Sequence, residues 1–180
     1  MIWLITVGLW GAAEATFFFI VPDVLLTAAV LRLGFRRALP LALIGAATAA
    51  FAGLGMWWWG SHDAAAARDA MLIVPAVGPD LLARAHEEMA GAWPLHLFVG
   101  AVTGLPYKLY AVEAGALGLN PILFVLVSFV ARLPRFLLTM ALAWLADNGL
   151  HKIGKARWRF AVWAASWIAL YAIYFALRGV

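Results

Sequence analysis

The chain contains no cysteine, and only 12% of its 180 residues carry charged side chains. The absence of thiols excludes disulfides and thiolate metal sites, and it leaves the redox compartment undecided. Soluble domains carry about a quarter charged residues, so the shortage of charge argues against a soluble fold. Because there is neither a cysteine nor a cluster of histidines, no metal site, no cofactor and no enzymatic activity are expected.

Apolar residues dominate instead, with 66% of the chain hydrophobic and a mean hydropathy of +0.94. A membrane-spanning helix needs roughly 20 consecutive apolar residues. Five apolar segments satisfy or approach that length: about 2–31, 39–59, 94–119, 121–146 and 160–177. The expected fold class is therefore all-α and integral to a membrane, with residues 1–180 forming a single membrane domain.

Two of these segments are interrupted in the middle by proline and charge. "IVPDVL" breaks segment 2–31 at Pro22, and "TGLPYKLY" breaks segment 94–119 at Gly104 and Pro106. Proline removes a backbone donor, and irregular backbone at membrane depth survives only where protein or a wet cavity covers it. The broken segments therefore either span the membrane or form re-entrant hairpins that return to the side they entered.

The loop charges favour the re-entrant hairpins. Basic residues follow segments 2–31 and 121–146, whereas acidic residues outnumber basic ones in the 60–93 loop. Positively charged loops prefer the cytoplasm, and both basic loops share one side only if 2–31 and 94–119 are re-entrant. The remaining three apolar segments are then transmembrane helices. The prediction is a multi-pass protein of the cell's inner membrane, with a cytoplasmic N-terminus and a C-terminus outside.

The external loop, residues 60–93, is expected to contain an amphipathic helix. Leu81, Leu82, Ala85 and Met89 share one helical face, which suits the surface of a membrane. His86 on the same helix is expected to be solvated.

A faint internal repeat follows the two broken segments. "LRLGFRRALPLAL" and "GALGLNPILFVL" each place a Leu-Gly turn before a proline that opens a span. Two hairpins that enter from opposite faces would relate the two halves by inversion in the membrane plane, which is typical of transporters.

Six ionisable residues lie inside the apolar segments: Glu14, Asp23, Lys108, Glu113, Arg132 and Arg135. Each unpaired charge at the bilayer centre costs roughly 2.5–3.5 kcal/mol, so the six must be paired, protonated or wetted. One interpretation is internal salt bridging that only holds the bundle together. The other is a polar site near the membrane midplane, where the two hairpin tips meet.

The basic residues of this set suit an anionic ligand. Arg132 and Arg135 are three residues apart and share a helix face, with Ser128 one turn before them. Arginine holds phosphate through paired donors. Lys108 follows the break at Pro106, close to the start of a half-helix whose N-terminal dipole also attracts anions.

The acidic residues suit a cation or a proton. Glu14 and Asp23 stand on either side of the first break. Glu113 lies five residues after Lys108, about 140° around a helix, so the two are not a local pair. Glu113 is expected to meet Tyr110 or an arginine across the bundle, and its role stays open.

Three motifs in this order resemble the DedA superfamily, also called SNARE-associated Golgi or VTT proteins, and most closely its YqaA-like branch. They are "EATFFFIVPD", "GLPYKLYAVEAG" and "ARLPRFLL", within residues 8–140. In that family an acid precedes a re-entrant tip that ends in a second acid, a second tip carries Pro-(Phe/Tyr)-Lys, and an Arg-x-x-Arg-Phe helix follows. The chain departs from the family pattern at Pro22-Asp23, which is shorter than Pro-Gly-Glu, and at Pro134.

The resemblance implies two opposed re-entrant helical hairpins, three transmembrane helices and movement of lipid between leaflets. The transport residues it implies are Glu14, Asp23, Lys108, Arg132 and Arg135. Tyr107, Ser128 and Glu113 are further candidates.

The expected function is a membrane lipid translocator of the flippase or scramblase type. Its substrate would be an anionic phospholipid or a polyprenyl phosphate, and its movement could be coupled to protons. The alternatives are an ion or small-solute transporter that uses the same charged midplane pocket, and a structural factor whose ion pairs only staple the helices. The expected partners are membrane lipids with a phosphate head group and no nucleic acid, and a homo-oligomer stays open.

Overall fold

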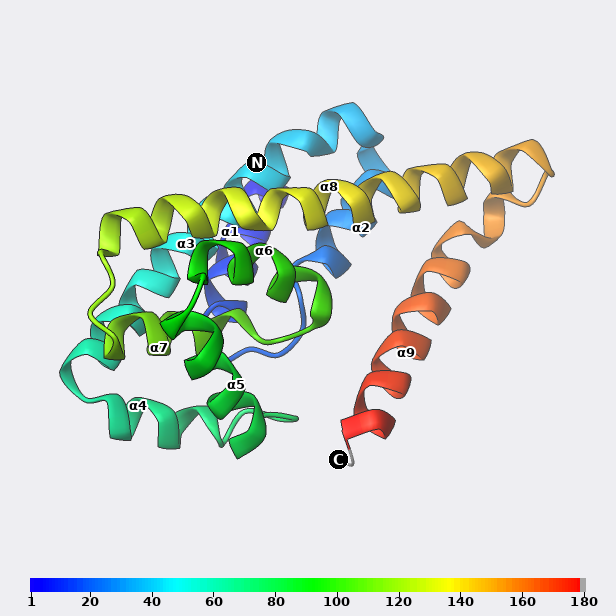
Figure 1. The fold of residues 1–180 in the computed structure, drawn as a ribbon. Coiled ribbons are helices and arrows are strands. Elements are labelled where there is room, and N and C mark those ends of the chain that lie inside the picture. The colour runs from blue at the N-terminus through cyan, green and yellow to red at the C-terminus, as the bar shows by residue number, and fades with distance from the viewer. Residues whose placement is uncertain (179–180) are drawn as a thin grey trace.

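The computed structural model describes residues 1–178, and this part of the chain contains helices joined by turns and no strand (Figure 1). A short 3-10 turn, Ala156–Trp158, precedes the last helix. The α-helices are α1 Ile2–Glu14, α2 Asp23–Leu33, α3 Phe35–His62, α4 Ala64–Met71, α5 Pro79–Ala90, α6 Trp93–Thr103, α7 Tyr107–Ala116, α8 Pro121–Lys152 and α9 Arg159–Arg178.

Three helices, α3, α8 and α9, are long and apolar enough to cross a membrane. They coincide with the three spans predicted from the sequence, which supports a membrane-embedded protein. Two of them extend several residues beyond the predicted spans. The helix α3 begins at Phe35 and contains Pro40, and α8 continues to Lys152 without a break at Pro134.

Both interruptions predicted from proline and charge are present. Residues 15–22 separate α1 from α2, and α6 ends at Gly104, whose left-handed backbone (φ 82°, ψ 17°) an L side chain would resist. Pro106 then has extended backbone before α7 begins. The helices α1 and α6 have 13 and 11 residues, a rise of only about 20 and 17 Å. Neither reaches across a hydrocarbon core of about 30 Å.

The helix α3 forms the centre of the bundle and packs against α1, α7 and α8. Glycines bring the backbones close together, because a Cβ at Gly11 would lie 2.7 Å from the carbonyl oxygen of Gly45. A Cβ at Gly115 would likewise collide with the backbone of Trp57. Small residues at helix contacts are the usual means of close packing in membrane bundles.

The loop between α3 and α6 contains two helices, α4 and α5. The apolar face predicted for α5 exists, but Leu81, Ala85 and Met89 are buried against the core. Because α6 and α7 cover this face, it is not free for the membrane surface, and that expectation is wrong. An amphipathic pattern is the same whether protein or lipid covers the apolar side.

Two turns are rich in basic residues, the α2–α3 turn and the α8–α9 turn, and these two basic turns lie at the same end of the molecule. The Arg32 guanidinium lies 5.0 Å from the ring centre of Phe160, which joins the end of α2 to the start of α9. At the opposite end, Trp57 Nε1 donates a 3.0 Å hydrogen bond to the carbonyl oxygen of Leu119. The helices α3 and α8 therefore run antiparallel, and α9 stands apart from the bundle (Figure 1).

Candidate functional site

The two arginines of α8 hold the two acids of the first break. Arg132 Nη1 lies 2.9 Å from Glu14 Oε2 at the end of α1. Arg135 Nη1 lies 3.1 Å from Asp23 Oδ2 at the start of α2. The side chains of Glu14, Asp23 and Arg132 are less than one tenth exposed. The spacing on α8 thus matches the two ends of the break, one arginine for each acid.

Arg132 keeps donor capacity beyond its ion pair. Its guanidinium lies over the ring of Tyr107, 4.0 Å from the ring centre. Within residues 1–178, its Nε and Nη2 are buried without a hydrogen-bond partner. Buried polar groups almost always have a partner, so these nitrogens are available to an acceptor.

Asp23 is held by more than its arginine. Thr139, one turn after Arg135 on α8, donates a 2.9 Å hydrogen bond to Asp23 Oδ1. Asp23 also opens α2, where a carboxylate is favoured by the positive end of the helix dipole. Asp23 is therefore held by a hydroxyl and a helix N-terminus in addition to its arginine.

Lys108 joins the two breaks. It is buried in the first turn of α7, and its Nζ donates a 2.7 Å hydrogen bond to the carbonyl oxygen of Phe18, inside the first break. This contact brings the second break against the first. A cation at a helix N-terminus adds to the positive end of the dipole rather than offsetting it. The junction of the two breaks is therefore electropositive.

Glu113 does not belong to this junction. Arg68 on α4 donates two hydrogen bonds of 2.6 Å to its carboxylate, and His86 Nδ1 lies 2.8 Å from Oε2. The expected arginine partner exists, but it comes from the loop, and Tyr110 donates to Glu88 instead. The expectation of a solvated His86 is wrong in part, since its half-exposed ring contacts Glu113.

The remaining predicted residues frame the junction. Pro22 and Pro106 precede the first residues of α2 and α7, and Gly104 ends α6. Ser128 is buried on α8, one turn before Arg132. Sequence reasoning missed Thr139, although its position four residues after Arg135 places it on the same helix face.

The depth of the junction suits a site inside a bilayer. Arg132 stands eleven residues after the first residue of α8, a rise of about 17 Å. That distance is about half of a hydrocarbon core of roughly 30 Å. At this depth the protein holds two buried acids against three bases, Lys108, Arg132 and Arg135. The excess of positive charge and of free donors suits an anion with several acceptor oxygens.

Neither the protein-family models, nor the curated proteins, nor the solved structures compared with the chain give a match.

Proposed function

We propose that the protein is a lipid translocator of the flippase or scramblase type, which moves an anionic phospholipid or a polyprenyl phosphate between leaflets. The phosphate would bind at Arg132, Lys108 and Arg135. The observation that carries the proposal is the pair of buried Arg132 nitrogens without a partner, beside an electropositive junction of two broken helices. The resemblance of the motifs to the DedA superfamily supports the same function.

The Glu14–Arg132 ion pair supplies a mechanism by which a phosphate replaces the carboxylate at the guanidinium. A phosphate that reaches Arg132 competes with Glu14 for the guanidinium, and the unpartnered Nε and Nη2 give it a first point of attachment. Protonation of Glu14 would release Arg132 toward the phosphate. A proton would then shift the population between an ion-paired state and a lipid-bound state by its different affinity for the two.

The same proposal includes the topology. The pairs α1–α2 and α6–α7 would be two opposed re-entrant hairpins, related by an inverted repeat, and the basic turns would face the cytoplasm of the inner membrane. Support comes from the position of both basic turns at one end, next to the Arg32–Phe160 contact. Positively charged loops on the cytoplasmic side then place the N-terminus inside and the C-terminus outside.

A cation carrier fits this arrangement less well. Hard cations need several free oxygen ligands, whereas Glu14 and Asp23 each already pair with an arginine. Flux of cations or protons across protein-containing vesicles, without movement of lipid, would favour the ion transporter over the lipid translocator.

The decisive experiment measures head-group flipping in proteoliposomes. Purified protein is reconstituted with a fluorescent phosphatidylglycerol, polyprenyl phosphate or phosphatidylcholine, and a membrane-impermeant quencher reports which leaflet the lipid occupies. We expect flipping of the anionic lipids, with and without a proton gradient, and its loss in Arg132→Gln. The matched control is Arg36→Gln, an exposed basic residue outside the site. Folded protein that flips no anionic lipid would overturn the proposal.

The topology is tested with single cysteines, since the chain has none of its own. Arg36→Cys and Arg157→Cys should react with an impermeant thiol reagent from one side, and Glu87→Cys from the other. All three positions are exposed and lie outside the junction. Labelling of Arg36→Cys and Arg157→Cys from opposite sides would refute the two-hairpin topology.

A further inference from the structure

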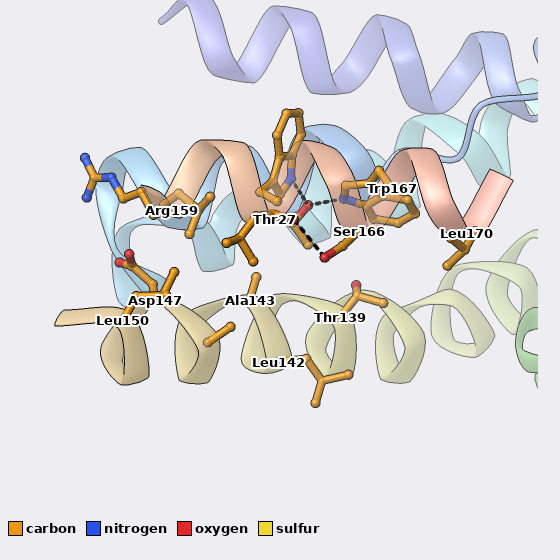
Figure 2. A pocket seen from close by; sticks show the side chains of 14 residues that line it. Thr27, Thr139, Leu142, Ala143, Asp147, Leu150, Arg159, Ser166, Trp167 and Leu170 are labelled. Carbon is orange, nitrogen blue, oxygen red and sulfur yellow. Dashed lines mark hydrogen bonds between the residues drawn. The ribbon is translucent and has the colours of Figure 1, made fainter. Parts of the chain in front are cut away.

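An apolar groove of about 310 Å³ lies between α8 and α9, with α2 as its third wall (Figure 2). Its volume falls at the lower end of the roughly 300–1,000 Å³ of small-molecule sites. The side chains that line it are mainly aliphatic or aromatic, among them Leu142, Leu150, Val162, Trp163 and Leu170. The groove is separate from the Arg132 junction, because none of the four ion-paired side chains of that junction lines it.

Two tryptophans of the helix α9 share one hydroxyl of α2. Trp163 Nε1 and Trp167 Nε1 both donate to Thr27 Oγ1 on α2, at 2.9 and 3.1 Å. No residue is buried in the 18-residue apolar window of α9. A helix this apolar and this exposed needs a cover that residues 1–178 do not provide. The two indole bonds fasten α9 to α2, the third wall of the groove.

The two ends of the groove differ in charge. Figure 2 shows Arg159 and Asp147 at one end and Leu170 at the other. The end with Arg159 adjoins the α8–α9 turn, where four basic residues outnumber the single acid Asp147. They are Lys152, Lys155, Arg157 and Arg159. This end suits an anionic head group at the membrane surface, and the aliphatic walls suit a hydrocarbon tail.

The length of the groove matches one leaflet. From Leu150 to Thr139, its lining on α8 extends eleven residues, or about 17 Å, close to half of a hydrocarbon core of roughly 30 Å. Thr139 both lines the groove and donates to Asp23, the partner of Arg135. The groove therefore runs from the basic turn to the Asp23 end of the charged junction.

We propose that this groove binds one acyl chain of an anionic lipid, whose phosphate is held by Arg159 at the basic turn. The lipid would wait in one leaflet with its tail parallel to α8, and Thr139 would connect its position to the Asp23–Arg135 pair. This deepens the proposed function and rests on it only for the step from waiting to translocation. The binding itself does not depend on whether the protein flips lipid.

The test measures contact between the groove and lipid tails at equilibrium. A small fluorophore is attached to Ala146→Cys, which lines the groove, or to Leu145→Cys, its exposed neighbour on another face of α8. Vesicles of phosphatidylcholine contain a small fraction of phosphatidylglycerol brominated on its acyl chains, or the same fraction of brominated phosphatidylcholine. Bromine quenches only a fluorophore that it touches.

We expect quenching at Ala146→Cys to favour phosphatidylglycerol by about fivefold, which corresponds to one basic residue at a membrane surface. The added change Arg159→Gln should remove the preference. At Leu145→Cys, Arg159→Gln should change nothing. The proposal would be overturned if the preference for phosphatidylglycerol were equal at both positions. It would also be overturned if the preference at Ala146→Cys survived Arg159→Gln. Disulfide formation between two Ala146→Cys chains would overturn it as well, because a second copy would then occupy the groove. Groove binding without flipping would defeat the proposed function alone, and flipping without groove binding would defeat this inference alone.

Discussion

The two broken segments carry similar sequence features but are held in different ways. The acids of the first break, Glu14 and Asp23, are both neutralised by arginines of the long helix α8. The charges of the second segment separate: Lys108 donates to the carbonyl of Phe18, whereas Glu113 accepts from Arg68 of α4. The first broken segment therefore pairs with the long helix α8, and the second pairs partly with α4, which packs over α7.

The difference shows how a membrane protein assigns roles to buried charges. A charge inside a bilayer must be compensated, and compensation by another spanning helix creates a polar junction at mid-depth. Compensation by a loop outside the spans instead fastens the loop to the bundle. Glu113 belongs to the second kind, and the Glu14–Arg132 pair to the first. Substitutions can therefore separate the two roles.

The largest effect is expected at the Glu14–Arg132 pair, which is compensated within the bundle. Arg132→Gln leaves the Glu14 carboxylate buried without its cation, which for a buried pair costs about 3–5 kcal/mol. We expect a strong loss of thermal stability in detergent and the loss of flipping. The double change Glu14→Gln with Arg132→Gln should recover most of the stability, because both buried charges are removed together.

The double change also separates a transport site from a staple. If Arg132 binds phosphate, the recovered double variant still does not flip lipid. If the ion pair only holds helices together, the double variant flips at the native rate, and the proposed role of Arg132 is wrong.

A smaller effect is expected at the other end of the first break. Arg135→Gln removes one partner of Asp23, but Thr139 still donates to Oδ1, and Arg135 is about one fifth exposed. We expect a stability loss of about 1–3 kcal/mol, the cost of an incompletely satisfied buried polar group, and slower flipping. Thr139→Val, measured by the same unfolding and flipping assays, should have a milder effect of the same sign. A loss in Arg135→Gln as large as in Arg132→Gln would contradict this order.

The contact between Glu113 and Arg68 predicts a local effect. Glu113→Gln weakens the contact with Arg68, whose pKa the hydrogen bonds to Glu113 raise above its ordinary value. We expect α4 and α5 to loosen from α7, so that a protease cleaves the 72–78 connection faster, while flipping stays near the native rate. Glu87→Gln on the exposed face of α5 is the control. Loss of flipping with an unchanged cleavage rate would place Glu113 in the transport site after all.

The spans and the breaks could be predicted from the sequence because their causes are local. An apolar run of about 20 residues forms a spanning helix in a bilayer, and "IVPDVL" and "TGLPYKLY" contain the prolines that start α2 and α7. The shared face of Arg132 and Arg135 also follows from helix periodicity. The face does not reveal which acid each arginine holds, because that depends on how the first break folds between Glu14 and Asp23.

The parts that sequence reasoning missed depend on contacts between distant segments. Nothing in the spacing of Arg68 or His86 connects either residue to Glu113, which lies 45 and 27 positions away. The apolar face of α5 is evident, but its periodicity is the same whether α7 or a membrane covers it. The tight approach of α3 and α7 depends on Gly60 and Gly115, whose neighbours only the packing reveals.

The smallest expected effect is a pH dependence of stability that is confined to α5. Burial tends to raise the pKa of Glu88, but hydrogen bonds from Tyr110 and Arg84 outweigh it, and the pKa lies below its ordinary value. Such a group stabilises the fold above the pKa of about 4.3 that glutamate has when unfolded, and this stabilisation is lost as the pH falls through the lower folded value. Hydrogen exchange of α5 should therefore accelerate in acid more steeply in the native chain than in Glu88→Gln, and Glu87→Gln should behave as the native chain. An identical acid response of Glu88→Gln and the native chain would show that another group fastens α5 to the bundle.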